Sequence, residues 1–371
     1  MKVGVFGGSF DPLHNGHKVI INMAIELLNL DLMVLVPSFN PPHKSKSSAS
    51  FNDRYAMLVE EFKDNKKIKV ERIEEEMGLE YSYTYVVLDI LKSFYGDDLY
   101  YIIGADSMID FSTWKFPQIV ASQATLVVIK RAGYFNLDEA IMFAKSQYNS
   151  NVIELDIKTD DISSSVLRGQ LELFEPDAKK FIPKEAYRYI INNNLYSNYK
   201  EIIDKLKSNL SQKTFEHSKR TTLFALQYIT KLKIPFHKAF LASLLHDCAK
   251  GIEGSIEDIE KLNTTKEVYH QFLGATLAKE IYEIDDEDIL NAIKYHTTGR
   301  ENMSSLEKLV YIADKLEPGR QYEGLDAIRQ RLNENFNFAF NMLLKFNLEY
   351  LKSNKENIDS RTISTYLWYN Q

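Results

Sequence analysis

The sequence predicts two folds in one chain: an α/β domain with a doubly wound parallel sheet over residues 1–196, and an all-α domain over residues 197–371. Up to about residue 193, short apolar or β-branched runs alternate with helix-like stretches. Beyond residue 198 no convincing strand appears. The polar run 191–198, Ile-Asn-Asn-Asn-Leu-Tyr-Ser-Asn, marks the boundary, and 371 residues suit two domains of roughly 100–200 residues each.

In the first domain, alternating strands and helices imply a parallel sheet with right-handed crossovers. Strands are expected at Val3–Phe6, Leu32–Val36, Lys67–Arg72, Leu99–Ile103, Thr125–Lys130 and Val152–Leu155. Helices are expected at His17–Leu30, Asn52–Asp64, Ser82–Tyr95, Leu137–Tyr148, Ser163–Leu171 and Pro183–Asn193, the last with proline in its first turn.

The second domain carries helical patterns only, which predicts a helical bundle. The expected helices are Glu201–Ser211, Phe215–Leu232, Lys238–Ala249, Ile256–Leu262, Gln271–Glu283, Asp286–His296, Ser304–Leu316, Gly324–Asn333 and Phe336–Ser353.

Composition excludes several classes of protein. The net charge is -7 and no basic stripe is visible, so nucleic acid is not an expected partner. The single cysteine, Cys248, rules out a disulfide within the chain and fits a reducing cytoplasm. No signal-type segment opens the chain, and no apolar run approaches the roughly 20 residues of a membrane span. The oligomeric state is left open.

The sequence Gly-Gly-Ser-Phe-Asp-Pro-Leu-His-Asn-Gly-His, residues 7–17, follows the first expected strand and opens the first helix. Gly7 and Gly8 let the backbone approach a nucleotide closely, and a helix N-terminus offers amide donors to phosphate. His14 and His17 are three residues apart and can face the same anion. The alternative is a structural role, in which both histidines hydrogen-bond the loop to the sheet.

This string resembles the signature of the nucleotidyltransferase superfamily. Four further segments are similar to those of bacterial nicotinate-nucleotide adenylyltransferases, so that the resemblance covers residues 1–196. They are residues 37–44 (PSFNPPHK), 53–58 (DRYAML), 102–108 (IIGADSM, with Trp114 following) and 162–168 (ISSSVLR). Valines stand at positions 86 and 87, where the family often has Asp and Thr.

The resemblance implies that ATP and nicotinate mononucleotide give deamido-NAD and pyrophosphate, with Mg²⁺ on the phosphates. His14 and His17 would be catalytic. Ser163, Ser164 and Arg168 would clamp the β- and γ-phosphates, Trp114 would stack on the pyridine ring, and Lys44 would attract the acidic substrate. The full implied nucleotide-binding set is Gly7, Gly8, Ser9, Phe10, Lys44, Gly104, Asp106, Trp114, Arg131, Ser163, Ser164 and Arg168.

Histidines and aspartates recur along the second domain, at His217, His246, Asp247, His270, His296 and Asp314. Asp314 follows the apolar run 309–313 and is therefore expected to be a buried carboxylate, which needs a partner or a metal ion. Nitrogen and oxygen ligands suit Fe, Mn, Ni or Zn, and spacing does not choose among them. A chance distribution of histidines is the alternative.

The order His…His-Asp…Asp resembles the HD-domain phosphohydrolases. Residues 244–250, 293–300 and 311–320 are similar to symmetrical bis(5'-nucleosyl)-tetraphosphatases, which split diadenosine tetraphosphate into two ADP, and the resemblance covers residues 205–335. It implies one or two transition-metal ions. One would be held by His217, His246, Asp247 and Asp314, and a second would be completed by His270 and His296, with Asp247 bridging. Lys250 would be catalytic, and Lys250, Arg300 and Arg320 would neutralise the polyphosphate.

Two alternatives remain open from the sequence. The helical half could be a regulatory module that binds nucleotide without hydrolysing it. The first half could transfer adenylate to another acceptor, such as phosphopantetheine or nicotinamide mononucleotide. Two positions near the second site also depart from the family pattern: Thr214, where arginine is frequent, and Gln271, where glycine is common.

Overall fold

The structure is a computed structural model that describes residues 1–39, 49–78, 83–130, 136–159 and 163–370. The chain divides into two compact units, Met1–Ser197 and Asn198–Gln371.

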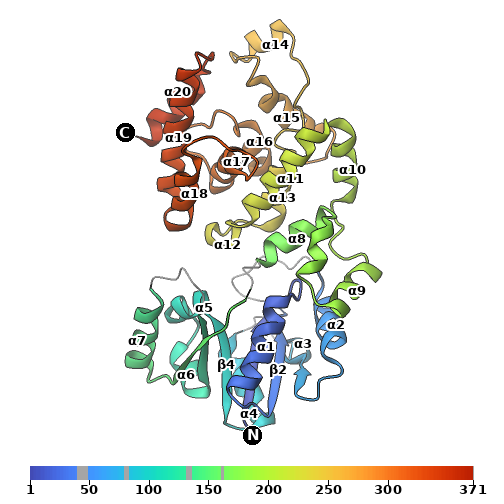
Figure 1. The fold of residues 1–371 in the computed structure, drawn as a ribbon, viewed down its shortest axis with the longest axis vertical. Coiled ribbons are helices and arrows are strands. Elements are labelled where there is room, and N and C mark those ends of the chain that lie inside the picture. The colour runs from blue at the N-terminus through green and yellow to red at the C-terminus, as the bar shows by residue number, and fades with distance from the viewer. Residues whose placement is uncertain (40–48, 79–82, 131–135, 160–162, 371) are drawn as a thin grey trace. The chain divides into compact units, whose positions relative to one another are not determined.

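The first unit contains one six-stranded sheet in which every strand pairing is parallel (Figure 1). Its strands are β1 (Val3–Gly8), β2 (Leu32–Pro37), β3 (Ile68–Val70), β4 (Leu99–Gly104), β5 (Thr125–Lys130) and β6 (Val152–Asp156). Their order across the sheet is β3-β2-β1-β4-β5-β6. The chain runs outward from β1 through β2 and β3, then returns to the other side of β1 at β4. The predicted doubly wound sheet is confirmed.

Helices follow the strands as the alternating pattern predicts. The longer ones are α1 (Asn15–Leu27), α2 (Phe51–Phe62), α4 (Thr84–Tyr95), α7 (Leu137–Tyr148), α8 (Ser164–Glu172) and α9 (Lys184–Asn192). The sequence did not predict the short elements α3 (Ile73–Glu76), α5 (Ala105–Ile109), η1 (Phe111–Thr113), α6 (Pro117–Gln123) and η2 (Pro176–Lys180). One or two turns are too few for a 3.6-residue period to stand out.

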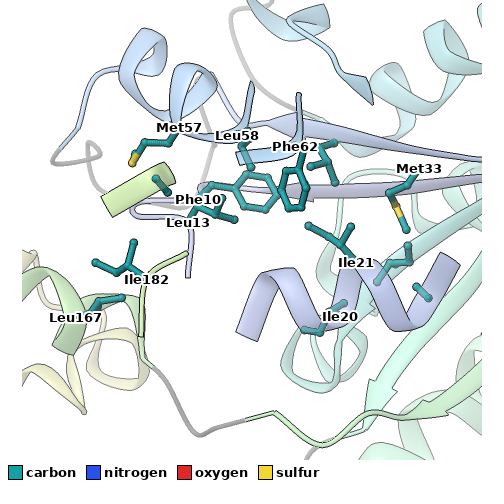
Figure 2. Close-up of a cluster of buried hydrophobic side chains, with 14 of the residues drawn as sticks. Phe10, Leu13, Ile20, Ile21, Met33, Met57, Leu58, Phe62, Leu167 and Ile182 are labelled. Carbon is teal, nitrogen blue, oxygen red and sulfur yellow. The ribbon is translucent and has the colours of Figure 1, made fainter. Parts of the chain in front are cut away.

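The apolar core of this unit has two layers, one on each face of the sheet. Successive residues of a strand point to opposite faces. Accordingly, Met33 and Leu35 of β2 belong to one buried cluster, while Val34 and Val36 belong to the other. Figure 2 shows the first cluster, in which Phe10 of the loop after β1 packs among side chains of α1 and α2. The loop that carries the two histidines is therefore anchored in the core.

The second unit is built from helices, and among its described residues no strand is present, as predicted. The helices are α10 (Lys200–Asn209), α11 (Gln212–Leu226), α12 (Ile229–Leu232), α13 (Phe236–Leu245), α14 (Ile256–Lys261), α15 (Tyr269–Glu280), α16 (Glu287–Lys294), α17 (Ser305–Leu316), α18 (Leu325–Glu334), α19 (Phe336–Ser353) and α20 (Ser360–Tyr369). The expected helix 215–232 is broken into α11 and α12.

The prediction missed α20. Its sequence, SRTISTYLWY, is rich in β-branched and aromatic residues, which are weak helix formers. Asp359 caps its first turn through the Arg361 amide, and Thr362 and Thr365 are buried. Because α20 packs on α19, tertiary contacts favour a helix that local propensity does not.

The centre of the second unit is a group of four packed helices. Helix α11 packs against α13 and α17, and α16 packs against the same two helices. Serine and aspartate caps fix where three of them begin: Ser211 for α11, Asp286 for α16, and Ser304 with Glu307 for α17. Over the described ranges of the chain, none of the helices has the length and apolar character needed to cross a bilayer.

Candidate active sites

The carboxyl ends of β1 and β4 lie side by side where the strand order reverses. Gly7 and Gly8 end β1, and Gly104 ends β4. In open parallel sheets, ligands bind in the crevice at such a point. A cavity of about 110 Å³ lies here, and its lining includes Gly7, Gly8, Thr84 and Tyr101. The fold therefore places the predicted nucleotide loop at the expected ligand position.

His14 and His17 cap the first turn of α1 reciprocally. The Nδ1 atom of His14 accepts the His17 amide at 3.4 Å, and Nδ1 of His17 accepts the His14 amide at 3.3 Å. The two rings stack with their centroids 3.6 Å apart. Because each Nδ1 accepts a hydrogen bond, the proton of each neutral ring lies on Nε2, which makes Nε2 a donor. The histidines thus have a structural role, as helix caps, and their Nε2 donors belong to the turn that opens α1.

Residues of α8 reach the same loop. Ser163 is the N-cap of α8, Ser164 is its first residue, and the hydroxyls of Ser163 and Ser165 lie 2.7 Å apart. From the second turn, Arg168 donates a hydrogen bond to the carbonyl of Asp11 at 2.6 Å. The structure therefore brings Arg168 to the loop of His14, although the two positions lie far apart in the sequence.

A buried arginine, Arg54 of α2, holds the loops around this site together. Its guanidinium donates to the carbonyls of Ser9 at 2.7 Å, Ser38 at 2.9 Å and Ala49 at 3.4 Å, and the residue is 2% exposed. Burial lowers the pKa of Arg54. Sequence reasoning noted the segment 53–58 but assigned this arginine no role, because its carbonyl partners leave no pattern in the sequence.

The remaining predicted residues of the first site are placed as follows. Gly104 is the N-cap of α5, and a Cβ atom there would lie 2.4 Å from Oδ1 of Asp106, so a side chain at this position would displace that carboxylate. Trp114 is half-buried and packs edge-on against Phe111, with ring centroids 5.3 Å apart, so it lies against the second core cluster. Lys44 and Arg131 lie outside the described residues.

In the second unit, His217 of α11, His246 at the end of α13 and Asp314 of α17 converge. Nε2 of His217 lies 3.0 Å from Oδ1 of Asp314 and 3.3 Å from Nε2 of His246. Nε2 of His246 lies 3.7 Å from Oδ1 of Asp314. These three residues form one group that could hold a metal ion. Asp314 is 8% exposed, so the buried carboxylate that the sequence predicts is present.

Asp247 joins this group to a second one. Its Oδ2 lies 3.7 Å from Nε2 of His246, while its Oδ1 lies 3.2 Å from Nε2 of His270 and 3.4 Å from Nε2 of His296. The two latter nitrogens are 3.2 Å apart. The six predicted ligand residues are therefore brought together, with Asp247 between the two sets of histidines.

Each of the four histidines is oriented through its other ring nitrogen. Nδ1 lies within hydrogen-bonding distance of a backbone carbonyl in three of them: His246 with Ser243, His270 with Glu267 and His296 with Ile293. In His217 the partner is the carboxylate of Glu317, at 3.0 Å. Because these acceptors place the ring proton on Nδ1, the Nε2 lone pairs point at one another, which is the arrangement of metal-binding histidines.

The charges of the cluster fit a cation. Burial alone would raise the pKa of the Asp247 and Asp314 carboxyls, but the surrounding histidines and lysines outweigh it and hold both well below the usual range. Burial lowers the pKa of His296 to about 4, so that ring is neutral at neutral pH. Oδ1 of Asp247 is buried and accepts no hydrogen bond from the described residues. The neutral imidazole of His296, the ionised carboxylates and the unsatisfied oxygen are donors that suit a divalent metal.

Of the three predicted phosphate contacts, two lie at this cluster. Nζ of Lys250 is 3.3 Å from Nε2 of His270, and the guanidinium of Arg320 donates to Oδ1 of Asp314 at 2.8 Å. Arg300 makes a bidentate ion pair with Glu307, at 2.6 and 3.2 Å.

Sequence reasoning missed three side chains around the ligands. Glu317, which holds His217, is itself paired with Arg220. Lys315 donates to Oδ2 of Asp314 at 3.3 Å and to the carbonyl of His296 at 2.9 Å. Gln271 is fully buried, and its side-chain oxygen accepts a hydrogen bond from the Thr297 amide. This bond fixes the backbone that follows His296. The departure from the family pattern at position 271 thus has a structural role.

Comparison with known proteins agrees with this division. Residues 5–170 match the cytidylyltransferase-like family and residues 214–319 match the HD domain. A Mycoplasma genitalium protein, named a probable nicotinate-nucleotide adenylyltransferase/Ap4A hydrolase, is 31% identical over 362 residues, which cover 93% of this chain and 97% of that protein. A probable nicotinate-nucleotide adenylyltransferase of Clostridium acetobutylicum is 36% identical over 200 residues, covering 53% of this chain and 98% of the relative.

A crystal structure of a predicted HD superfamily hydrolase involved in NAD metabolism, from Clostridium acetobutylicum, shares 35% identity with a TM-score of 0.41. It covers 46% of this chain and 96% of that one.

The fold and the two sites define the class: a nucleotidyltransferase domain joined to an HD-type hydrolase domain in one enzyme. Because the Mycoplasma genitalium match extends over nearly the whole of both proteins, the chain belongs to the family of that bifunctional adenylyltransferase/hydrolase. The prediction that two enzymes are joined is confirmed. The HD domain is a divalent-metal domain, and the His and Asp groups described above supply candidate ligands.

Proposed function

We propose that residues 1–196 transfer the adenylyl group of ATP to nicotinate mononucleotide, giving deamido-NAD and pyrophosphate. The observation that carries this proposal is the reciprocal pair His14–His17, whose Nε2 donors stand at the N-terminus of α1 beside the switch point of the sheet. The name of the Mycoplasma genitalium relative supports the choice of acceptor.

In this reaction a phosphate oxygen of the mononucleotide attacks the α-phosphorus of ATP, and the bond to the leaving pyrophosphate breaks. The attacking phosphate is already an anion, so no general base is needed, and catalysis consists of positioning and charge stabilisation. His14 and His17 donate to the phosphate oxygens on which charge develops. Arg168, with Ser163 and Ser164 at the start of α8, binds the β- and γ-phosphates. Mg²⁺ enters with ATP and neutralises part of its charge.

The acceptor would use the cavity beside Gly7 and Gly8, with Trp114 stacking on its pyridine ring. Val87 lines this cavity, and Thr84 and Tyr101 supply hydroxyls. In this proposal Gly104 and Asp106 lie at the nucleoside. Lys44 and Arg131 remain predictions from the sequence.

Product analysis tests the acceptor. The full chain is incubated with MgATP and, in turn, nicotinate mononucleotide, nicotinamide mononucleotide and phosphopantetheine, and products are separated and identified by mass. We expect deamido-NAD and pyrophosphate in equal amounts from the first. Faster turnover of either other acceptor would overturn the assignment.

We propose that residues 197–371 hydrolyse diadenosine tetraphosphate symmetrically to two ADP, with one or two metal ions among Fe, Mn, Ni and Zn. The observation that carries this proposal is the position of Asp247 between two sets of candidate ligands. His217, His246 and Asp314 lie on one side of it, and His270 and His296 lie on the other. The bound metal would supply Lewis acidity and an activated water. Lys250 and Arg320, both in contact with the cluster, bind the phosphate chain and offset the charge that the leaving ADP gains.

Arg300, whose side chain is 40% exposed, is a further candidate for binding the polyphosphate. Its guanidinium stacks over Tyr295 at 4.8 Å while it is paired with Glu307. A substrate phosphate would have to compete with that carboxylate.

Metal analysis and nucleotide analysis together distinguish hydrolysis from a regulatory role. The purified full chain should contain at least one transition-metal ion per chain and convert diadenosine tetraphosphate to ADP alone. Formation of AMP and ATP would contradict symmetrical cleavage. Binding of the tetraphosphate without turnover, in metal-replete protein, would favour the regulatory module instead.

A further inference from the structure

The Asp11 carboxylate lies inside the nucleotide loop and is held from several sides. Asp11 is 3% exposed. Its Oδ1 accepts a hydrogen bond from the hydroxyl of Tyr196 at 2.8 Å and one from the amide of Ala49 at 3.2 Å. Its Oδ2 faces the guanidinium of Arg168 at 3.7 Å, and its carbonyl accepts from the same guanidinium at 2.6 Å. Asp11 therefore links Tyr196 to an arginine that the proposed function assigns to ATP.

Tyr196 comes from the last residues of the first unit, 185 positions after Asp11. It is 3% exposed and belongs to the same buried cluster as Phe10 and Leu13. Its backbone φ is +57°, in the left-handed region that aromatic residues rarely adopt. Such a conformation persists where surrounding contacts impose it. Burial and the Asp11 anion raise the pKa of the Tyr196 phenol well above its ordinary value, so the hydroxyl remains a donor.

We infer that Tyr196 is a positioning residue for adenylyl transfer, which holds Asp11 and thereby orients Arg168 toward the phosphates of ATP. Two donors on Oδ1 fix the rotation of the carboxylate, and this rotation turns Oδ2 toward Arg168. The guanidinium is then fixed by a carboxylate and a carbonyl before ATP binds, which lowers the entropic cost of binding. This inference rests on the proposed function, since it assumes that Arg168 binds ATP.

The variant Tyr196→Phe removes one hydroxyl and leaves the ring in the core. In the full chain we expect the KM for ATP to rise about 5–10-fold, while the KM for nicotinate mononucleotide changes less than about twofold. A hydrogen bond to a charged group is worth at least that factor, and part of it is transmitted to Arg168. A purely structural role would move both KM values together.

The matched control is Tyr189→Phe. Tyr189 donates its hydroxyl to an aspartate of the same unit, Asp53, at 3.1 Å. The change deletes the same chemical group without touching Asp11. We expect both KM values to stay within about twofold of the unaltered chain.

A double-variant cycle tests whether Tyr196 acts through Arg168. In an Arg168→Lys background, Tyr196→Phe should raise the KM for ATP by less than about twofold, because the orientation that it secures is already lost. A full 5–10-fold rise in that background would overturn the inference. So would a Tyr196→Phe variant that behaves like Tyr189→Phe, or one in which both KM values rise equally.

Calorimetric titration with a non-hydrolysable ATP analogue repeats the comparison without turnover. If the unaltered chain made no dinucleotide, the proposed function would fail. The inference would still be judged by the Kd, which should rise about 5–10-fold in Tyr196→Phe only. An unchanged Kd in an otherwise active enzyme would refute the inference alone.

Discussion

Replacing Glu317 by glutamine should weaken metal binding in the HD domain without changing any proposed ligand. The Glu317 side chain is 1% exposed and accepts four hydrogen bonds: from Nδ1 of His217 at 3.0 Å, from Arg220 at 2.7 and 3.2 Å, and from the Gly319 amide at 2.6 Å. It is the carboxylate that orients His217, whereas backbone carbonyls orient the other three histidines. Burial alone would raise the pKa of the Glu317 carboxyl, but the hydrogen bonds from His217 and Arg220 outweigh burial and lower this pKa to about 2.

A glutamine has one acceptor oxygen in place of two, so its amide group must face Arg220, the Gly319 amide or the His217 ring as a competing donor. Loss of an outer partner of a metal-bound histidine typically lowers metal affinity by about 10–100-fold. This factor corresponds to about 1.4–2.7 kcal/mol of binding free energy. We therefore expect Glu317→Gln to show a metal Kd higher by about that factor in competition with a chelator.

The chain offers a close control in Glu307→Gln. The Arg300–Glu307 pair has side-chain exposures of 40% and 1%, against 41% and 1% for Arg220–Glu317, and its Nε–Oε distance is 2.6 Å against 2.7 Å. Both changes cost stability, but only Glu317 contacts a proposed ligand. Equal metal Kd values for the two variants, or an unchanged Kd in Glu317→Gln, would refute the reasoning.

Three further predictions concern the two reactions. His17→Ala should lower the rate of dinucleotide synthesis by about 10²–10³-fold and leave polyphosphate hydrolysis intact; near-normal synthesis by a folded variant would contradict its role. The Asp247→Ala variant should lose bound metal and polyphosphate hydrolysis but keep dinucleotide synthesis. Metal analysis and both activity assays are run on one preparation. Full metal content with unchanged hydrolysis would exclude the bridging role. The kcat/KM for nicotinate mononucleotide should exceed that for the nicotinamide form, because a site built for a carboxylate leaves donors unpaired beside an amide; equal values would show that the choice of acceptor is wrong.

Elements were predicted best where the signal lies within the segment itself. All six strands appear near their expected places, because buried β-branched runs between polar turns are local signals. The helix expected at 215–232 breaks after Leu226. Helix α20 was missed because it depends on packing against α19. Local propensity does not contain that information.

The candidate site residues also divide into those that a local sequence pattern indicates and those that only contacts in the folded chain reveal. The string from Gly7 to His17 is contiguous, so the sequence alone indicated its chemistry. The partners that hold it, Arg54 and Tyr196, act on backbone carbonyls or on a single carboxylate oxygen, and nothing in the sequence marks such contacts.

The sequence by itself determined the two fold classes, the nucleotide loop and the identity of the six candidate metal ligands. Only the tertiary structure decided that the side chains of those six residues meet, with Asp247 between two sets of histidines. It also decided which nitrogen of each ring points inward, since that choice depends on an acceptor from another turn or another helix, such as Glu317 for His217. Helical periodicity places a side chain on one face of its own helix, but the distance between two helices is set by how their buried faces pack.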